Sequence, residues 1–298
     1  MANVEQRVVP ATTMMKKPTS SMAIFRRRLM RNRMSVFGLV LIALLLLVAI
    51  FAPILAPHDP STIFYDAVLA PVGTPDHLLG TDTVGRDLFS RILYGARVSV
   101  VVGAIAVGIS MSLGVTVGLI AGFYGGWVDS VLMRIVDIFL AFPVILLAIA
   151  IMGALGPSLI NVLIALGIVG WAQYARLVRG EVLSVKEREF VEAGRAIGAS
   201  SLRLMAVYIL PNVIAPVIVV ATFGMATAIL AEASLSFLGL GIQPPTPSWG
   251  SILADGRTLM RQAPHVTIFP GLAIALTILG LNFLGDGLRD ALDPRLRQ

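Results

Sequence analysis

The chain has 298 residues, of which 57% are hydrophobic and only 13% are charged, whereas a soluble domain carries about 25% charged residues. It contains no cysteine, which excludes disulfides and thiol-based metal or redox sites. The net charge of +6 fits the excess of Lys and Arg that membrane proteins carry on their cytoplasmic side, so no nucleic-acid partner is needed to explain it. The apolar residues come in long runs, which predicts an all-α polytopic membrane protein.

The N-terminal region, residues 1–34, contains the basic stretch RRRLMRNR, Arg26 to Arg33. A basic stretch before an apolar run resembles a secretory signal, but this run is longer than a signal core and ends in APILAPHDP without a clear cleavage site. We therefore interpret residues 35–56 as a retained first transmembrane helix. The basic stretch is expected to form a helix on the cytoplasmic membrane surface, with membrane lipid as its partner.

Six apolar runs of roughly 20 residues follow one another, and at about 1.5 Å per residue each matches a hydrocarbon core of ~30 Å. They predict six transmembrane helices at Ser35–Ala56, Val98–Gly122, Val131–Gly153, Ser158–Arg176, Asn212–Leu235 and Val266–Gly285. After the first helix, the chain is then divided into an external segment 57–97, a core 98–285 with five transmembrane helices, and a cytoplasmic tail 286–298.

Lys and Arg are unevenly distributed among the segments between these runs. Of the 23, the external segments hold only Arg86, Arg91, Arg97, Arg257 and Arg261. The others lie on segments assigned to the opposite side. The positive-inside rule therefore predicts that both termini are cytoplasmic.

Two features within the runs suggest specific contacts. Gly114, Gly118 and Gly122 are spaced four residues apart, which lets another helix pack closely against them. Asp137 lies three residues after Arg134 in the third run. An intramembrane carboxylate is a functional hypothesis by default, but a structural Asp137–Arg134 pair near the cytoplasmic interface explains it equally well.

The external segment after the fifth run contains LGLGIQPPTPSWG, Leu238–Gly250, whose prolines and glycines exclude a regular helix. Glu232 lies beside it, near the external end of the fifth run. Two interpretations of Glu232 stay open: it shapes an external gate, or it simply reaches water. The candidate gate or docking residues are Glu232, Pro244, Pro245 and Trp249.

Motifs of common enzymes are missing from the sequence. There is no GxxxxGK[ST] phosphate loop, no HExxH and no GxSxG, and His58, His77 and His265 lack metal-ligand spacing. We expect no catalytic residue, no metal site and no bound cofactor in this chain. A membrane-embedded hydrolase is a poorer hypothesis than a transport pathway that draws its energy from elsewhere.

A charged segment, Arg188 to Ser200, separates the fourth and fifth runs. If it is a helix, one face can pack on the membrane domain through Phe190, Val191, Gly194 and Ile197. The opposite face carries Arg188, Glu192, Arg195 and Ala199. Glu192 and Arg195 can pair at i, i+3, and small residues beside such a pair would let another protein approach closely. An ordinary interfacial helix has the same periodicity. Pro211 is expected to open the fifth helix.

At these residues the sequence resembles the EAA loop of binding-protein-dependent ABC importer permeases. Glu192-Ala193-Gly194, then Gly198, then Ile209-Leu210-Pro211 match the pattern EAA---G---------I-LP, except that Gly194 replaces the second alanine. Three further stretches, HLLGTDTVGRDLFSRILYGARVS, SFLGLGIQPPTPSWG and FLGDGLRDALDPRLR, resemble C-type permease subunits of peptide importers, most closely the dipeptide permeases. The same branch includes glutathione, nickel and opine importers.

This resemblance implies a type I importer fold in the bacterial inner membrane and several partners. The chain would pair with a paralogous permease, and one or two P-loop ATPase subunits would bind ATP and Mg²⁺. A periplasmic binding protein would deliver di- or oligopeptides to the external loops.

The resemblance also implies a coupling helix seated in a groove of the ATPase, formed by Glu192, Ala193, Gly194, Arg195, Gly198, Ala199, Ser200 and Pro211. Glu192 would make polar contacts there, and Ala193, Gly194 and Gly198 would permit the close fit. The main alternative from a different class is a secondary transporter driven by an ion gradient. It would need intramembrane ionisable residues or inverted repeats, and neither is clear.

Overall fold

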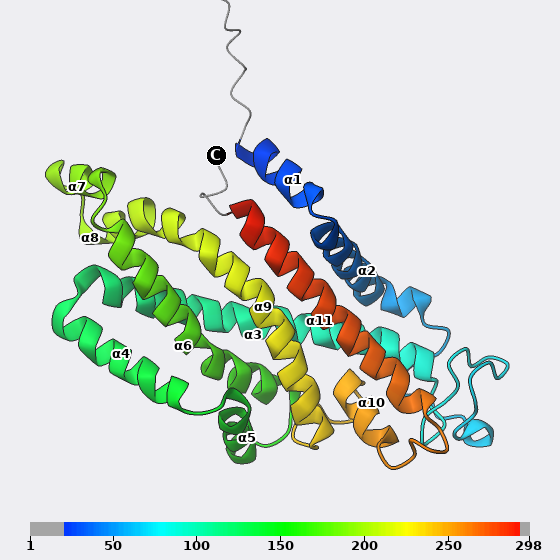
Figure 1. The fold of residues 1–298 in the computed structure, drawn as a ribbon. Coiled ribbons are helices and arrows are strands. Elements are labelled where there is room, and N and C mark those ends of the chain that lie inside the picture. The colour runs from blue at the N-terminus through cyan, green and yellow to red at the C-terminus, as the bar shows by residue number, and fades with distance from the viewer. Residues whose placement is uncertain (1–20, 293–298) are drawn as a thin grey trace, which may run out of the picture.

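The computed structural model describes residues 21–292, and these residues form helices joined by loops, without a β-sheet (Figure 1). The α-helices are α1 (Ser21–Arg31), α2 (Arg33–Leu55), α3 (Leu88–Tyr124), α4 (Gly126–Ala141), α5 (Val144–Leu155), α6 (Leu159–Val185), α7 (Glu189–Ala196), α8 (Ser201–Arg203), α9 (Leu210–Phe237), α10 (Trp249–Gly256) and α11 (His265–Leu292). A 3-10 turn, η1 (Tyr65–Ala67), and a π-helical turn, η2 (Leu204–Ile209), complete the set. Our predictions for residues 1–20 and 293–298 lie outside the described residues.

Five helices of the described chain are long and apolar enough to cross a membrane: α2, α3, α6, the helix of residues 201–237 formed by α8, η2 and α9, and α11. The pair α4 and α5 passes the same test together but is bent by 90°, so the number of spans is six if this pair counts as one. The run Val131–Gly153, predicted as a single transmembrane helix, is divided between α4 and α5. Pro143 lacks a backbone N–H, and it holds Phe142 in an extended conformation that ends α4.

Several helices are longer than the apolar runs that predicted them. The helix predicted to start at Val98 is α3, which begins at Leu88, inside the predicted external segment. The helix predicted to end at Arg176 is α6, which continues to Val185. The helix predicted to end at Gly285 is α11, which continues to Leu292, so the start of the predicted cytoplasmic tail is helical. Polar residues at a helix end can stay helical outside the hydrocarbon layer, where hydropathy alone gives no signal.

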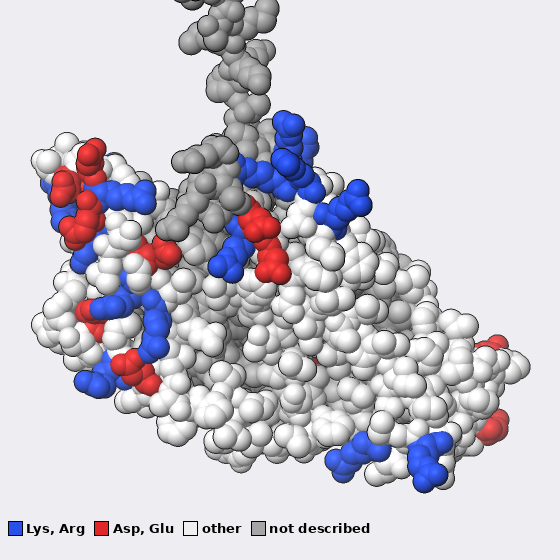
Figure 2. Space-filling view, viewed as in Figure 1, with Lys and Arg blue, Asp and Glu red and all other residues white. Residues whose placement is uncertain are grey.

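The polar elements gather at two opposite ends of the molecule. Figure 1 shows α1, α7 and α8 at one end, and α10 and the loop of residues 56–87 at the other. We call these the α7 end and the α10 end. In Figure 2, charged residues cluster around α1 and α7 and over α4 and α6, and a few lie at the α10 end. The surface between them is largely uncharged, as expected for a membrane-facing belt.

The basic N-terminal stretch forms a helix of its own. Asn32 separates α1 from α2, because its side chain accepts hydrogen bonds from the N–H groups of Met34 at 3.0 Å and Ser35 at 3.4 Å and so caps α2. The Asn32 amide also donates to Asp290 of α11 at 3.3 Å. The predicted basic helix is therefore present, and its junction with the first span is attached to the last helix.

A glycine seam joins α3 to α6, the most extensive helix contact in the described chain. A Cβ added at Gly114 or Gly118 would lie 2.5 Å from the backbone oxygen of Trp171 or Ala175, respectively. At Gly122 it would lie 2.8 Å from Val182. The predicted close packing is confirmed, and the partner of the seam is the fourth span.

Substitution in this seam should be costly. We expect Gly118→Ala to lower the free energy of unfolding by about 1–3 kcal/mol, because the new methyl overlaps the α6 backbone. The thermal midpoint of the purified protein in detergent measures the change. Gly108→Ala on the same helix is the matched control, since its methyl would meet nothing within 4 Å. Equal midpoints for the two variants would contradict the seam.

Candidate functional site

Helix α7 is attached to the membrane helices through one buried face. Val191 is fully buried and Gly194 is buried. A Cβ at Gly194 would lie 3.0 Å from Leu204 and 3.2 Å from Tyr208 of η2. Gly194 therefore packs on the membrane helices, as its place on the predicted packing face indicated. Because Gly194 has no side chain, α7 can pack closely on η2 of its own chain. This close packing also explains why glycine fits at the position where the EAA pattern has its second alanine.

The other face of α7 is open. Glu192, Ala193 and Arg195 are exposed, as predicted. The predicted Glu192–Arg195 ion pair is absent from the described residues. Instead, the Arg195 guanidinium carbon lies 6.0 Å from the ring centroid of Phe123, at the end of α3. This leaves the Glu192 carboxylate free of intrachain partners within the described range.

The turn after α7 is a Schellman motif built on Gly198. Gly198 has φ +80°, its N–H donates to Arg195 O at 2.9 Å, and the N–H of Ala199 donates to Gly194 O at 3.0 Å. This turn directs Ile197 outward, where it is 79% exposed, and Leu202 of α8 is 73% exposed. The prediction that Ile197 packs on the membrane domain is therefore wrong.

The remaining predicted residues link α7 to α9. Ala199 is half-buried and packs against the main apolar core, so it does not lie on the open face as predicted. Ser200 is exposed and caps α8 by accepting the N–H of Arg203 at 3.4 Å. Pro211 lies in the first turn of α9, as predicted. It has no N–H to continue the α-helical ladder, and the π-turn η2 immediately before it absorbs the break, with Leu210 N–H donating to Met205 O.

At the α10 end, Glu232 does not reach water. It is fully buried, and its Oε1 accepts a hydrogen bond from Ser236 Oγ at 2.7 Å. Ser236 Oγ in turn accepts the N–H of Ile242 at 3.1 Å. Of the two interpretations left open, solvation is wrong. The carboxylate instead fixes the start of the Leu238–Gly250 loop to α9.

Trp249 is also buried rather than available for docking. Its indole N–H donates to Ile92 O at 3.0 Å, and the ring covers Gly95 of α3, where a Cβ would lie 2.7 Å from Trp249 Cδ1. Pro244 and Pro245 are exposed. Trp249 also begins α10, so the helix-free prediction for the loop holds only as far as Ser248, which caps that helix.

The motif HLLGTDTVGRDLFSRILYGARVS folds around a buried carboxylate. Asp82 is fully buried and accepts the N–H groups of Val84 and Arg86 at 3.0 and 2.9 Å. It also pairs with the Arg86 side chain at 2.7 Å and with buried Arg91. Both arginines reach Asp255 of α10, at 3.1 and 3.4 Å. The network thus connects the external loop, α3 and α10.

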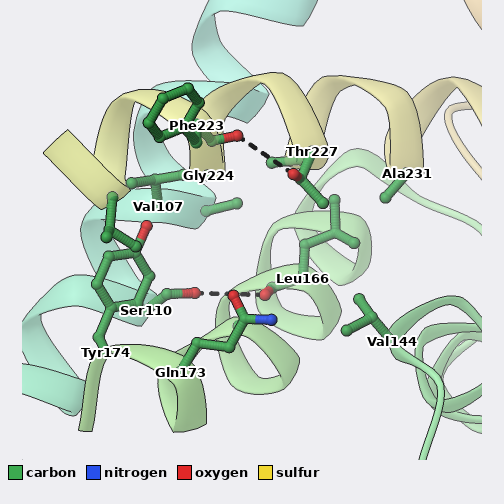
Figure 3. Close-up of a pocket in the computed structure, with 14 residues that line it drawn as sticks. Val107, Ser110, Val144, Leu166, Gln173, Tyr174, Phe223, Gly224, Thr227 and Ala231 are labelled. Atoms are coloured by element: carbon green, nitrogen blue, oxygen red, sulfur yellow. Dashed lines mark hydrogen bonds between the residues drawn. The ribbon is translucent and has the colours of Figure 1, made fainter. Parts of the chain in front are cut away.

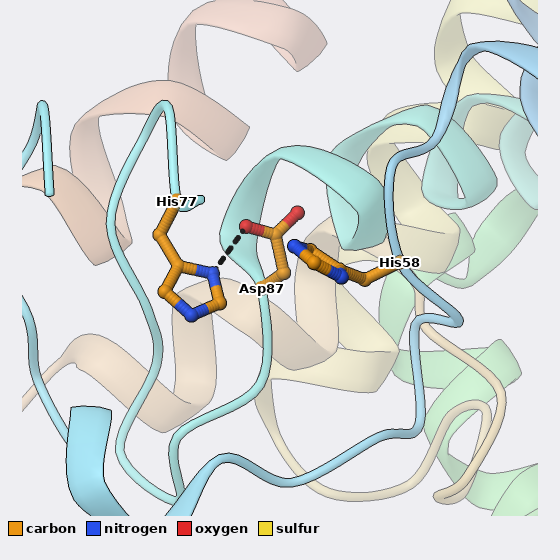
Figure 4. A group of neighbouring side chains, drawn as sticks. All are labelled: His58, His77 and Asp87. Carbon is orange, nitrogen blue, oxygen red and sulfur yellow. Dashed lines mark hydrogen bonds and ion pairs between the residues drawn. The ribbon is translucent and has the colours of Figure 1, made fainter. Parts of the chain in front are cut away.

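Two of the histidines that are far apart in sequence converge with Asp87, contrary to the expectation of scattered positions. Figure 4 shows His77 directed at Asp87, with His58 on the other side. Their possible ligand atoms all lie within 4.8 Å of one another. His77 Nδ1 lies 3.0 Å from Asp87, the other Asp87 oxygen accepts from Ser90, and His58 Nε2 lies 2.8 Å from Asp76 O. A metal ion would have to displace at least one of these bonds.

A cavity lies between α3, α5, α6 and α9 (Figure 3). Most of its lining is apolar, and its four polar side chains are Ser110, Gln173, Tyr174 and Thr227. Helix α6, which precedes α7, and helix α9, which follows α7, both contribute residues to the wall of the cavity. The cavity was not predicted, because it depends on how four separate helices pack.

Ion pairs hold α4 to α6 beside this region. Asp137 pairs with Arg176 and not with Arg134 as predicted, because α4 packs antiparallel to α6 and brings the two side chains together. Nearer the α7 end, Arg179 donates to both oxygens of Asp129, with the Nε bond at 2.7 Å. The pair with Arg176 thus gives Asp137 a structural partner in the described chain.

Comparisons with known proteins agree with this architecture. Residues 114–298 match the family described as binding-protein-dependent transport system inner membrane component, and residues 20–71 match the N-terminal TM domain of oligopeptide transport permease C. The fold is similar to that of the MetNI methionine ABC transporter in its inward-facing form, with a TM-score of 0.56 and 19% identity over 68% of this chain and 97% of that chain. This similarity supports the predicted type I importer fold.

Curated relatives cover most of the chain. A dipeptide transport system permease protein of Alkalihalophilus pseudofirmus is 49% identical, covering 91% of this chain and 89% of its own. A di/tripeptide transport system permease protein of Pseudomonas aeruginosa is 48% identical, covering 89% of both. A glutathione transport system permease protein of Escherichia coli is 47% identical, covering 92% of this chain and 90% of its own.

The Asp82 network makes a testable demand on stability. We expect Asp82→Asn to lower the free energy of unfolding by about 3–5 kcal/mol, because it leaves the buried Arg91 without its main counter-charge. Chemical or thermal unfolding in detergent measures the effect. Asp76→Asn, at an exposed carboxylate with no ion pair in the described chain, should change stability by less than about 0.5 kcal/mol. Similar losses for both would argue against the network.

Proposed function

Since the chain belongs to the family of binding-protein-dependent transport system inner membrane components, we propose that it is a permease subunit of an ABC importer for di- or oligopeptides. It forms one half of a membrane pathway, and a paralogous permease supplies the other half. ATP and Mg²⁺ are bound by separate ATPase subunits, so this chain is a transport subunit and not an enzyme. Its place is the bacterial inner membrane, with the α7 end in the cytoplasm and the α10 end in the periplasm.

The observation that carries this proposal is the open face of α7. Just after it, Ile197 at the C-cap of α7 and Leu202 of α8 are 79% and 73% exposed at the same end of the molecule, and large exposed apolar side chains mark a protein contact. Glu192 and Ala193 extend the same exposed surface with a free carboxylate and little bulk. This combination fits a groove on a soluble ATPase.

The connections of α7 supply a route for force. Only three residues, 186–188, join it to α6, and the Gly198 turn with α8 and η2 joins it to α9. Val191 and Gly194 pack it against η2, so α7 moves with the helix that follows. A displacement of α7 by the ATPase would therefore act on α6 and α9 together. Both helices line the central cavity, so the displacement would change access to the pathway.

The periplasmic end is the proposed docking side for the binding protein. Pro244 and Pro245 are exposed there, and the loop that carries them is fixed at its base by Glu232 and Trp249. A fixed base under an exposed tip suits a docking surface, because little ordering entropy is lost on contact. Glu232 and Trp249 thus support the docking surface and do not form it.

The proposed cargo follows from the relatives. Those at 48 and 49% identity are named as dipeptide or di/tripeptide permeases, and glutathione, the cargo in the name of the relative at 47%, has peptide bonds as well. The test is uptake of a labelled dipeptide by vesicles that contain both permeases and the ATPases, with binding protein added. ATP-dependent uptake that survives a protonophore supports the proposal, and uptake driven by an ion gradient without ATP would overturn it.

The α7 contact can be tested by crosslinking, because the chain has no cysteine of its own. We expect a thiol crosslinker at Ala193→Cys in native membranes to capture a P-loop ATPase, identified by mass spectrometry. Arg257→Cys, also at an exposed residue but at the α10 end, is the control and should capture no ATPase. A reactive thiol at residue 193 that captures no ATPase in the intact complex would contradict the α7 assignment.

A further inference from the structure

The central cavity contains a buried hydroxyl without a partner. Tyr174 of α6 is only 3% exposed, and its Oη makes no hydrogen bond among the described residues. Figure 3 shows the hydroxyl directed toward Gly224 of α9, at the edge of the cavity. Burying a hydroxyl unpaired is unfavourable, so this group calls for an explanation that lies outside the chain's own fold.

The packing around this hydroxyl leaves space for it. A Cβ at Gly224 would collide with Tyr174 Oη, while the next atoms, Tyr174 Cζ and Val107 Cγ2, would both be 3.5 Å away. Only the hydroxyl oxygen therefore requires glycine at position 224. Gly224 of α9 thus leaves room for the Tyr174 hydroxyl, a polar group that forms no hydrogen bond within the described chain.

The other polar groups of the cavity divide into two kinds. Ser110 Oγ donates to Gly167 O at 2.9 Å, and Thr227 Oγ1 donates to Phe223 O at 3.2 Å, so both are satisfied by backbone carbonyls. Gln173, the neighbour of Tyr174, makes no side-chain hydrogen bond in the described chain and is exposed. Two adjacent residues of α6 that line the cavity therefore carry groups without an intrachain bond: an exposed amide, and a hydroxyl buried at the cavity edge against Gly224.

We propose that this cavity is a transient binding site for the peptide, in which Gln173 and, when Gly224 of α9 moves away from it, the Tyr174 hydroxyl form hydrogen bonds to the peptide's main chain. The inference rests on the proposed function and adds the subsite that contacts the cargo. A peptide bond carries one acceptor and one donor whatever its side chains. A hydroxyl and an amide can each donate and accept, so together they can pair with both groups, while the apolar walls accept side chains of different size.

This arrangement suits a permease that must not hold its cargo tightly. The two polar groups satisfy the peptide bond, whose desolvation would otherwise oppose entry. No charged side chain lines the cavity, so no ion pair retains the peptide. Because α6 and α9 both connect to α7, a movement of α7 would change their separation, and this would expose or cover the Tyr174 hydroxyl.

Tyr174→Phe removes the hydroxyl and nothing else. In vesicles with the complete importer, we expect the apparent kcat/KM for dipeptide uptake to fall by about 3- to 10-fold, the loss of one hydrogen bond. The thermal midpoint should stay unchanged or rise, since the hydroxyl has no partner without peptide. Tyr94→Phe, on α3 and outside the cavity, is the matched control and should leave uptake unchanged. Wild-type uptake by Tyr174→Phe would overturn the proposal.

A second variant tests the geometry independently. Gly224→Ala should impair uptake at least as much as Tyr174→Phe, because the methyl displaces the hydroxyl. Combined with Tyr174→Phe, it should cause little additional loss, since the nearest remaining atoms are 3.5 Å away. Fully additive losses in the double variant would show that the hydroxyl is not the group affected.

A substrate analogue separates peptide contact from contact with the second permease. We compare a normal dipeptide with two analogues that both lack the peptide N–H: an ester in place of the amide, which also weakens the carbonyl as an acceptor, and an N-methylated amide, which keeps it. If the Tyr174 hydroxyl bonds to the N–H or to the carbonyl, the ratio of wild-type to Tyr174→Phe uptake should approach one for an analogue in which that group is missing or weakened. A ratio that is the same for every substrate, or a lowered thermal midpoint, would mean a structural role and overturn the site. If the wild-type complex transports no peptide at all, the proposed function itself fails, and this inference fails with it.

Discussion

The close contact between α3 and α6 is the constraint on which the rest of the structure depends. Gly114, Gly118 and Gly122 let the two backbones approach to a distance that no side chain would permit. Lipid supplies no hydrophobic driving force between helices, so such contacts must come from packing itself. The seam fixes α6, which carries Tyr174 in its middle and α7 at its end. Both the cavity and the position of α7 therefore depend on it.

The α10 end is organised differently, because loops and a short helix make up much of it. Its loops are held by buried polar groups, above all Asp82 with Arg86 and Arg91. Burying these charges is tolerable because they are paired and because Asp82 also accepts two backbone N–H groups. The result is an end of the molecule held together by buried ion pairs, whereas the α7 end presents an exposed helix face.

How much the sequence could predict depends on the range of the interaction. The bilayer sets the length of apolar runs, so the spans were predictable within their ends, and so were the glycine spacing and Pro211. Pro143 within the third run was a local signal for the bend. The convergence of His58, His77 and Asp87, the Asp137–Arg176 pair and the unpaired Tyr174 hydroxyl depend on contacts between separate segments. No periodicity or spacing reports such contacts.

The EAA-like segment illustrates how one motif combines two different constraints. Gly194 and Gly198 are both small, but Gly194 is required by packing on η2 and Gly198 by a left-handed φ of +80° that ends the helix. Glu192 and Ala193, between the buried positions, are the residues left for a partner. The turn at Gly198 also directs Ile197 and Leu202 outward. The segment's glycines therefore shape and attach the helix, and the neighbouring side chains form the exposed surface that we propose contacts the ATPase. For this reason the position of α7, and not only its surface, determines whether force can reach α6, α9 and the cavity between them.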